Sequence, residues 1–171
     1  MIETSRLLLQ PFAEGDLATL IKLRSDPEVA RYIGGEEYRR PEKIAERFRF
    51  YLENQRKYGF ACGRVVLRET GEIIGWAGLQ HMDDSEEIEV GYGFDKPYWG
   101  QGYATEAAAA LLRYGFAELG LERVVAVAEP ANVNSWRVME KLGLQYEREL
   151  VYKGFDCVLY AISQTDFAAS D

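Results

Sequence analysis

The segment of residues 88–128 constrains the fold of this chain more than any other part of its sequence. Residues 88–94 alternate with a period of two, which predicts a half-buried strand. Residues 103–119 carry apolar side chains at helical spacing, and residues 123–128 form an apolar run that predicts a buried strand. A strand, a helix and a strand in this order predict a right-handed crossover, with a ligand at the C-terminal end of the first strand.

A glycine-containing loop, Trp99-Gly100-Gln101-Gly102-Tyr103-Ala104, joins the first strand to the helix. Two glycines separated by one residue allow a tight turn that presents several backbone N–H groups in one direction, and the helix N-terminus adds its positive dipole end. The loop therefore predicts a site for an anion such as a phosphate. It is not a Walker loop, because no Gly-Lys-Ser/Thr occurs, and Thr105 stands where a dinucleotide-binding motif has its third glycine.

Size and composition predict a single domain over residues 1–171. With 47% hydrophobic and 28% charged residues, the chain has enough apolar side chains for a full core. The first residues are polar and show no signal-peptide pattern, and no apolar run approaches the roughly 18 residues that a membrane span needs. We therefore expect a cytoplasmic protein with no membrane partner.

Charge and cysteine content narrow the classes of partner. The 28 acidic and 20 basic residues give a net charge of −8, which disfavours binding to nucleic acid and favours cationic partners. Cys62 and Cys157 lie far apart in the sequence and lack the Cys/His spacing of a zinc site. We expect both to be reduced residues of the core or of strands, and we expect no metal.

Three further helices are predicted outside the crossover. Asp16 is a candidate N-cap for a helix that stops before Pro27, and Pro41 fits the first position of a helix that continues to residue 58. A short helix follows the second crossover strand, with Asn134 or Ser135 as its candidate N-cap.

Five further strands are predicted at residues 6–11, 62–67, 73–79, 144–152 and 155–162. A turn is expected near Met82-Asp83-Asp84-Ser85, and Lys153-Gly154 is expected to close a C-terminal hairpin. About seven strands and about four helices predict an α/β (α+β) fold around a mixed, mostly antiparallel sheet.

The order of these elements, the glycine loop and the stretch of residues 130–143 together resemble the GNAT superfamily of N-acetyltransferases. Four motifs more narrowly resemble the RimJ/RimL-type ribosomal-protein-alanine acetyltransferases: Thr4-Ser5-Arg6-Leu7, the glycine loop continued through Thr105-Glu106-Ala107, Asn132-x-x-Ser135 with Glu140-Lys141-Leu142-Gly143, and Lys153-Gly154-Phe155. The resemblance implies the GNAT acyl-CoA N-acyltransferase fold and acetyl transfer from acetyl-CoA to a primary amine. It is less specific for the acceptor, which is expected to be a protein N-terminus or a small molecule such as a polyamine, an amino acid or an antibiotic.

The resemblance also implies which residues bind acetyl-CoA. Backbone N–H groups of the loop would hold the pyrophosphate, and the end of the preceding strand would pair with the pantetheine arm. Asn132 would contact a CoA amide, although an asparagine there is also an ordinary turn residue. Trp99 departs from the family pattern, which has Gln or Arg at its position. The expected CoA-binding residues are Tyr92, Gly93, Phe94, Trp99, Gly100, Gln101, Gly102, Tyr103, Ala104, Thr105, Asn132 and Ser135.

Acetyl transfer to an amine needs a base, and Glu89 is the candidate. It alternates away from Ile88 and Val90 and shares its side of the strand with Gly91 and Gly93, so nothing bulky on that strand fills the space beside it. The alternative is that Glu89 is a solvent-facing strand residue without a catalytic role.

The departing CoA thiolate is expected to need a proton. Many family members use a tyrosine at the place of Met139, which cannot donate one. The resemblance to the ribosomal-protein branch points to Ser135 as the donor. The alternative is that Ser135 is only a helix cap.

Other residues have competing interpretations. Cys62 as an acyl-accepting nucleophile is disfavoured against core packing, because the only histidine, His81, has no visible link to it. The acidic pair Glu36-Glu37 is either an attractant for a cationic acceptor or a solvated loop. The aromatic residues between residues 32 and 60 are expected to be mostly core, and some are expected to line the acceptor pocket.

A non-catalytic CoA-binding module is the alternative to an enzyme. The chain is expected to be a monomer or a homodimer through its C-terminal hairpin.

Overall fold

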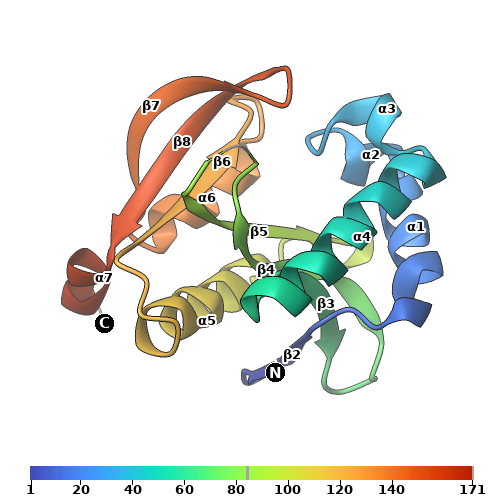
Figure 1. The fold of residues 1–171 in the computed structure, drawn as a ribbon, viewed down its shortest axis with the longest axis horizontal. Coiled ribbons are helices and arrows are strands. Elements are labelled where there is room, and N and C mark those ends of the chain that lie inside the picture. The colour runs from blue at the N-terminus through green and yellow to red at the C-terminus, as the bar shows by residue number, and fades with distance from the viewer. Residues whose placement is uncertain (84, 171) are drawn as a thin grey trace.

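A computed structural model describes residues 1–83 and 85–170 of the chain. Within these residues, eight strands form one sheet in the order β1-β2-β3-β4-β5-β6-β8-β7 (Figure 1). Neighbouring strands are antiparallel except for the parallel pair β5 and β6. The strands are β1 Ile2–Glu3, β2 Leu7–Gln10, β3 Cys62–Leu67, β4 Ile73–His81, β5 Ile88–Phe94, β6 Arg123–Ala128, β7 Gln145–Tyr152 and β8 Phe155–Ser163. The predicted mixed, mostly antiparallel sheet of an α/β fold is confirmed.

Helices cover both faces of the sheet (Figure 1). The α-helices are α1 Leu17–Ser25, α2 Pro27–Ala30, α3 Gly35–Tyr38, α4 Pro41–Tyr58, α5 Tyr103–Ala117, α6 Val133–Lys141 and α7 Gln164–Ser170, and the 3₁₀ helices are η1 Glu14–Asp16 and η2 Lys96–Tyr98. The four long helices correspond to the four predicted from sequence. The short helices α2, α3 and α7 and the two-residue strand β1 were not predicted, because elements of this length show no clear period.

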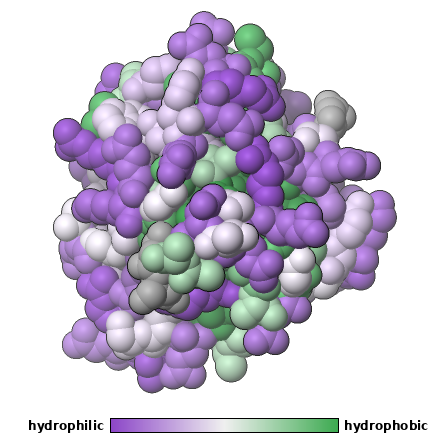
Figure 2. All heavy atoms as spheres, turned by 90° about the vertical axis from the view of Figure 1, so that its left-hand side faces the viewer, coloured by the Kyte–Doolittle hydropathy of each residue, from purple (hydrophilic) through white to green (hydrophobic). Residues whose placement is uncertain are grey.

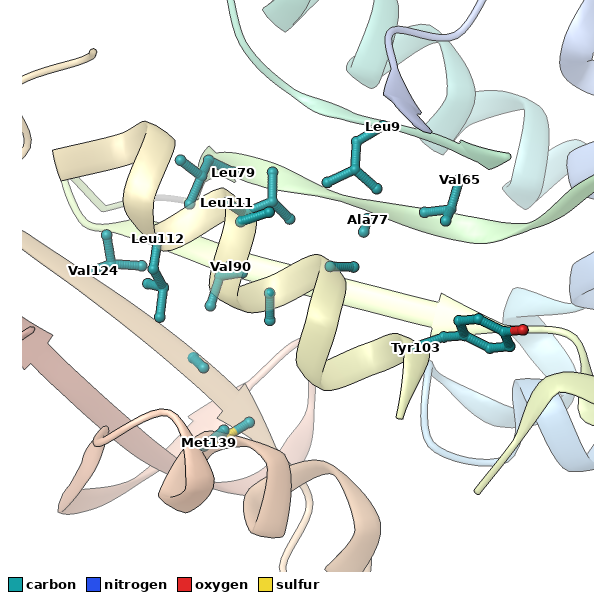
Figure 3. Close-up of a cluster of buried hydrophobic side chains, with 14 of the residues drawn as sticks. Leu9, Val65, Ala77, Leu79, Val90, Tyr103, Leu111, Leu112, Val124 and Met139 are labelled. Atoms are coloured by element: carbon teal, nitrogen blue, oxygen red, sulfur yellow. The ribbon is translucent and has the colours of Figure 1, made fainter. Parts of the chain in front are cut away.

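The crossover forms as the sequence predicts, with α5 connecting the parallel strands β5 and β6. Leu111 and Leu112 of α5 are buried against Leu79, Val90 and Val124 of the sheet (Figure 3). The helix approaches the sheet closely, since a Cβ atom at Gly115 would lie 2.9 Å from Leu79 Cδ1. This packing fixes the N-terminus of α5, where the glycine loop ends.

The opposite face of the sheet packs against α1 and α4. Leu20 of α1, Ile44 and Phe48 of α4 and Trp76 of β4 form this second core cluster. Because strand residues alternate between faces, Glu89, Gly91 and Gly93 of β5 point to this second face, while Val90 and Phe94 point to α5. The candidate base therefore lies on the face covered by α1 and α4.

The predicted turns are found wherever the structure describes them. Lys153 and Gly154 have φ values of 52° and 83°, as a two-residue hairpin turn between β7 and β8 requires. The turn predicted at residues 82–85 includes Asp84, and the predicted domain ends at Asp171, both of which lie outside the described residues.

Strand β7 is an edge of the sheet, and most of its residues are exposed. Figure 2 shows this side of the molecule, where hydrophilic residues cover most of the surface and hydrophobic ones form small patches. Among the described helices, none is both long and apolar enough to cross a membrane. Whether the chain is monomeric or pairs through its C-terminal hairpin stays a prediction.

Candidate active site

A cavity of about 190 Å³ is lined from both faces of the sheet, by Cys62 and Trp76 of the α1/α4 side and by Val90 and Met139 of the α5 side. Its walls come from α1, the α2–α3 segment, α4, strands β3 to β6, α6 and the β7–β8 hairpin. Four of the predicted site residues line it together, namely Glu89, Tyr92, Asn132 and Ser135. Segments that are far apart in the sequence therefore meet around the candidate base.

Glu89 is a buried carboxylate rather than a solvent-facing one. Only 7% of the residue is exposed, so the alternative interpretation of Glu89 as a solvated strand residue is wrong. Gln80, opposite Glu89 on β4, donates a hydrogen bond from Nε2 to Glu89 Oε1. Burial raises the pKa of Glu89, and the hydrogen bond from Gln80 opposes this rise only in part. A raised pKa brings a carboxylate closer to the range in which it accepts protons effectively.

A cluster of charged residues lies beside Glu89. The carboxylate of Asp83 forms ion pairs with Arg47 Nη1 at 3.2 Å and with Lys153 Nζ at 3.0 Å. Burial lowers the pKa of Lys153, and the neighbouring charge of Arg47 lowers it further. Both cations line the cavity and act electrostatically on Glu89. No sequence pattern predicts this cluster, because its members come from α4, the segment after β4 and the last hairpin.

The start of α6 brings two hydroxyl groups together. Tyr92 Oη donates a hydrogen bond of 3.0 Å to the carbonyl oxygen of Ser135 and lies 3.4 Å from Ser135 Oγ. Burial raises the pKa of Tyr92 to about 12, so its phenol is protonated at neutral pH. Met139 is buried one helical turn further along α6 and also lines the cavity. The Tyr92–Ser135 pair and Met139, the position where the family resemblance implies a tyrosine, therefore line the same cavity.

Asn132 is the N-cap of α6. Its side-chain Oδ1 accepts from the backbone N–H of Ser135 at 3.4 Å. The predictions that Asn134 or Ser135 caps this helix are therefore wrong, because α6 begins at Val133 and both residues lie inside it. The hydroxyl of Ser135 is free of the capping role and faces the cavity.

The glycine loop has the conformation expected of an anion site. Gly100 and Gly102 have φ values of 73° and 81°, which other residues rarely adopt. Gly102 is the N-cap of α5 and supplies no side-chain hydrogen bond, so the first N–H groups of the helix remain available to a ligand. Backbone N–H groups at a helix N-terminus are suited to binding phosphate-like anions.

Two larger side chains of the loop, Trp99 and Gln101, donate hydrogen bonds to backbone carbonyl groups of the residues just before the loop. Trp99 is 43% exposed, and its Nε1 donates to the carbonyl oxygen of Phe94 at 2.7 Å. Gln101 donates from Nε2 to the carbonyl oxygen of Pro97 at 2.8 Å. Phe94 and Tyr103 are core residues whose rings lie 6.4 Å apart. Anion binding at this loop would therefore rely on the backbone.

The N-terminal segment holds the loop in place, a role that the sequence analysis missed. Glu106 of α5 accepts hydrogen bonds from Thr4 Oγ1 at 2.6 Å, from Ser5 Oγ at 3.1 Å and from the backbone of Arg6 at 2.9 Å. Arg6 also forms an ion pair with Glu106 and donates to the carbonyl oxygen of Gln101 at 2.9 Å. Although burial opposes it, these hydrogen bonds lower the pKa of Glu106. The motif Thr4-Ser5-Arg6 thus has a structural explanation.

Strands β5 and β6 separate beyond the candidate base. In the described residues their parallel pairing is recorded only at Glu89 and Val125. Gly91, Tyr92 and Gly93 follow Glu89 on β5 and are partly exposed. Their backbone groups on this edge are therefore accessible to an extended ligand such as the pantetheine arm.

The disfavoured alternatives have structural explanations. Cys62 is 3% exposed, and burial raises the pKa of its thiol to about 12, so it is a core residue rather than a nucleophile. The ring of His81 packs against Tyr58 at 4.2 Å. Glu36 and Glu37 are exposed and do not line the cavity, whereas three of the aromatic residues in this region, Tyr32, Tyr38 and Tyr51, do.

A model of the acetyltransferase (GNAT) domain matches residues 6–145, which include the cavity residues of β5 and α6 and the glycine loop. The chain belongs to the GNAT acetyltransferase family. This acetyltransferase is 31% identical to the uncharacterized N-acetyltransferase YnaD of Bacillus subtilis over 97% of the chain and 98% of that protein. It is 35% identical to the uncharacterized protein YkkB of the same organism, with 86% of each chain covered.

The fold of the acetyltransferase agrees with solved structures of the family. The crystal structure of an acetyltransferase from Agrobacterium tumefaciens superposes with a TM-score of 0.84 and 30% identity, over 94% of this chain and 92% of that one. The protein is therefore an enzyme of the N-acetyltransferase class, whose family uses acetyl-CoA as co-substrate.

Proposed function

We propose that this acetyltransferase moves an acetyl group from acetyl-CoA to a primary amine by direct attack in a ternary complex. The observation that carries the proposal is the burial of Glu89 in a cavity that also holds the Tyr92–Ser135 hydroxyl pair. Residues 99–105 would bind the pyrophosphate, and the backbone of Tyr92, Gly93 and Phe94 would bind the pantetheine arm.

Glu89 is the base in this proposal. An acceptor enters as an ammonium ion and gives one proton to the Glu89 carboxylate, directly or through water. The amine nitrogen then attacks the thioester carbon, and its oxygen becomes negative. The hydrogen bond from Gln80 holds the carboxylate in place, so Gln80 is a positioning residue.

Ser135 is the proton donor to the leaving group. When the C–S bond breaks, the CoA thiolate takes a proton from Ser135 Oγ, and the second proton lost by the attacking nitrogen passes to this oxygen as the amide forms. The first proton leaves Glu89 for solvent after the products have formed. Tyr92 lies within 3.4 Å of Ser135 Oγ and positions it. Asn132 caps α6 and would also contact a CoA amide from the cavity wall.

The acceptor class is the finer part of the proposal. The resemblance to the RimJ/RimL-type branch favours a protein N-terminal amine such as that of a ribosomal protein, in the cytoplasm. A small-molecule amine is the second candidate, favoured by a cavity with walls on several sides.

A thiol-release assay with acetyl-CoA tests the proposal against a non-catalytic CoA-binding module. The panel contains peptides with free N-terminal amines, amino acids and polyamines. We expect CoA release that depends on the acceptor. Tight binding of acetyl-CoA without acceptor-dependent release from any member of the panel would support the binding module instead.

A further inference from the structure

Arg24 of α1 is a buried cation on the wall of the cavity. The residue is 6% exposed, and its guanidinium carbon lies 4.5 Å above the ring of Trp76. Nη2 donates to Tyr51 Oη at 2.9 Å, while Nε is buried and has no hydrogen-bond partner among the described residues. The structure records no ion pair between Arg24 and a carboxylate of the described chain.

This lack of a counter-ion is unusual for a buried arginine. A guanidinium offers five N–H donors, and a buried charge is normally paired. The other arginines in this region follow the rule, since Arg47 pairs with Asp83 at 3.2 Å and Arg64 pairs with Asp16 at 3.2 Å. A neutral phenol and an aromatic face leave most of the hydrogen-bonding capacity of Arg24 unused. Its charge is therefore available to a ligand.

Arg24 and Glu89 lie at separate points of one cavity. The ring of Trp76, over which the Arg24 guanidinium lies, belongs to a residue of β4 that pairs with Gly93 on β5. Gln80, further along β4, pairs with Glu89. Trp76 and Gln80 share a strand face and are four residues apart, which is about 13 Å along the strand. Gly91 lies between them on β5 and has no side chain to obstruct the space.

The positive charge of Arg24 disfavours a second cation of the acceptor at this end of the cavity. Arg24, Arg47 and Lys153 all line the cavity. Asp83 compensates Arg47 and Lys153, and Glu129 lines the cavity at the end of β6. Arg24 alone faces the cavity without an acidic partner in the described chain. One uncompensated positive charge matches one carboxylate, whereas a phosphate monoester carries between one and two negative charges at neutral pH.

We infer that the acceptor of this enzyme is a primary amine that also carries a carboxylate, with the amine at Glu89 and the carboxylate on Arg24. This inference rests on the proposed function, and it names the acceptor class. The planar guanidinium fork binds a carboxylate through two parallel hydrogen bonds. The positive charge of Arg24 also repels the second ammonium group of a polyamine. The net charge of −8, which favours cationic partners, therefore does not indicate the acceptor class.

Two matched amine series test the inference. One contains ε-aminocaproate, hexylamine and hexamethylenediamine, and the shorter one contains γ-aminobutyrate, butylamine and putrescine. Within a series only the terminal group changes, from carboxylate to methyl to ammonium. In at least one series we expect kcat/KM to be about 10- to 100-fold higher for the carboxylate than for the methyl compound, and lowest for the diamine. Equal values, or a preference for the diamine in both series, would overturn the inference and leave acetyl transfer itself intact.

Substitutions at Arg24 assign the preference to this residue. Arg24→Gln is expected to remove the preference for the carboxylate, and Arg24→Lys is expected to retain part of it because the charge remains without the fork. Arg49→Gln makes the same change on an exposed part of α4 and is expected to retain the preference fully. Retention of the full preference in Arg24→Gln would contradict the inference.

Binding provides a readout that does not need transfer. Titration calorimetry of ε-aminocaproate and γ-aminobutyrate into the enzyme with CoA should show binding of at least one compound that weakens about tenfold or more in Arg24→Gln. No binding, or binding unaffected by the substitution, would overturn the anion site. If no amine of any class supports thiol release, the proposed function fails, and this titration still decides whether Arg24 binds carboxylates.

Discussion

At the scale of single residues, the proposed chemistry depends on a carboxylate that is held away from water. Glu89 was predicted from its alternation with apolar neighbours, and the structure adds its burial and its partner Gln80. The sequence could not show either, because Gln80 lies on another strand and the covering residues come from distant helices and the last hairpin. A periodic pattern gives the side of a strand on which a residue lies, but it does not reveal what packs there.

The raised pKa of Glu89 predicts how stability depends on pH. The pKa is higher in the folded chain than in the unfolded one, so Glu89 contributes stability that is present below its unfolded pKa and lost as pH rises through the folded pKa. Glu89→Gln should therefore have a higher midpoint of thermal unfolding than the wild type at neutral pH. The difference should vanish in acid. A lower midpoint at neutral pH would show that the ionised carboxylate stabilises the fold.

Ser135 and Asn132 form a natural pair of variants at the start of α6. Because Asn132 is the cap, Asn132→Ala should lower the free energy of unfolding by about 1 kcal/mol. Ser135→Ala should change it by less than about 0.5 kcal/mol, because alanine suits a helical position, and should lower kcat by about 100-fold.

Chemical denaturation and steady-state kinetics on the same preparations separate these effects. Normal turnover in Ser135→Ala would remove Ser135 from the chemistry and point to the neighbouring Tyr92 hydroxyl as the proton donor.

At the scale of elements, the proposed function assigns binding of the donor to the loop and the start of α5. Gly102 has a left-handed conformation at the N-cap, so Gly102→Ala should destabilise the fold by about 1 kcal/mol and raise the KM for acetyl-CoA several-fold, because the N–H groups beside it would shift. Gly120→Ala is the control, since Gly120 is also left-handed, with a φ of 65°, but follows the other end of α5. It should lose similar stability without a change in KM. Equal effects of the two substitutions on KM would argue against the loop as the CoA site.

Elements were predictable where local chemistry specifies them. Pro41 begins α4, and Gly59, with a φ of 82°, ends it; Lys153 and Gly154 form the last turn. The interactions that hold elements together were not predictable. Glu106 and the segment Thr4-Ser5-Arg6 are about 100 residues apart in sequence, and no periodicity connects them. The family resemblance identifies these residues as a motif. The structure shows that they hydrogen-bond to Glu106 and to the backbone of Gln101 and so hold the loop in place.

At the scale of the whole molecule, the proposed donor-binding loop and the cations of the cavity come from different elements. The glycine loop lies at the N-terminus of α5, while Arg24, Arg47 and Lys153 reach the cavity from α1, α4 and the last hairpin. The net charge of −8 suggested cationic partners, yet these three cations line the cavity. Total charge describes the surface as a whole and not the composition of one site.

The most direct test of the account is the pH dependence of acetyl transfer in the wild type and in Glu89→Gln, at saturating acetyl-CoA and with the best acceptor. Wild-type kcat/KM should fall in acid with an apparent pKa above the ordinary value for glutamate, because burial raises the pKa of Glu89. Glu89→Gln should lack this limb and be slower by about 100-fold or more at neutral pH. Equal rates and the same profile in both proteins would contradict the role of Glu89 as the base.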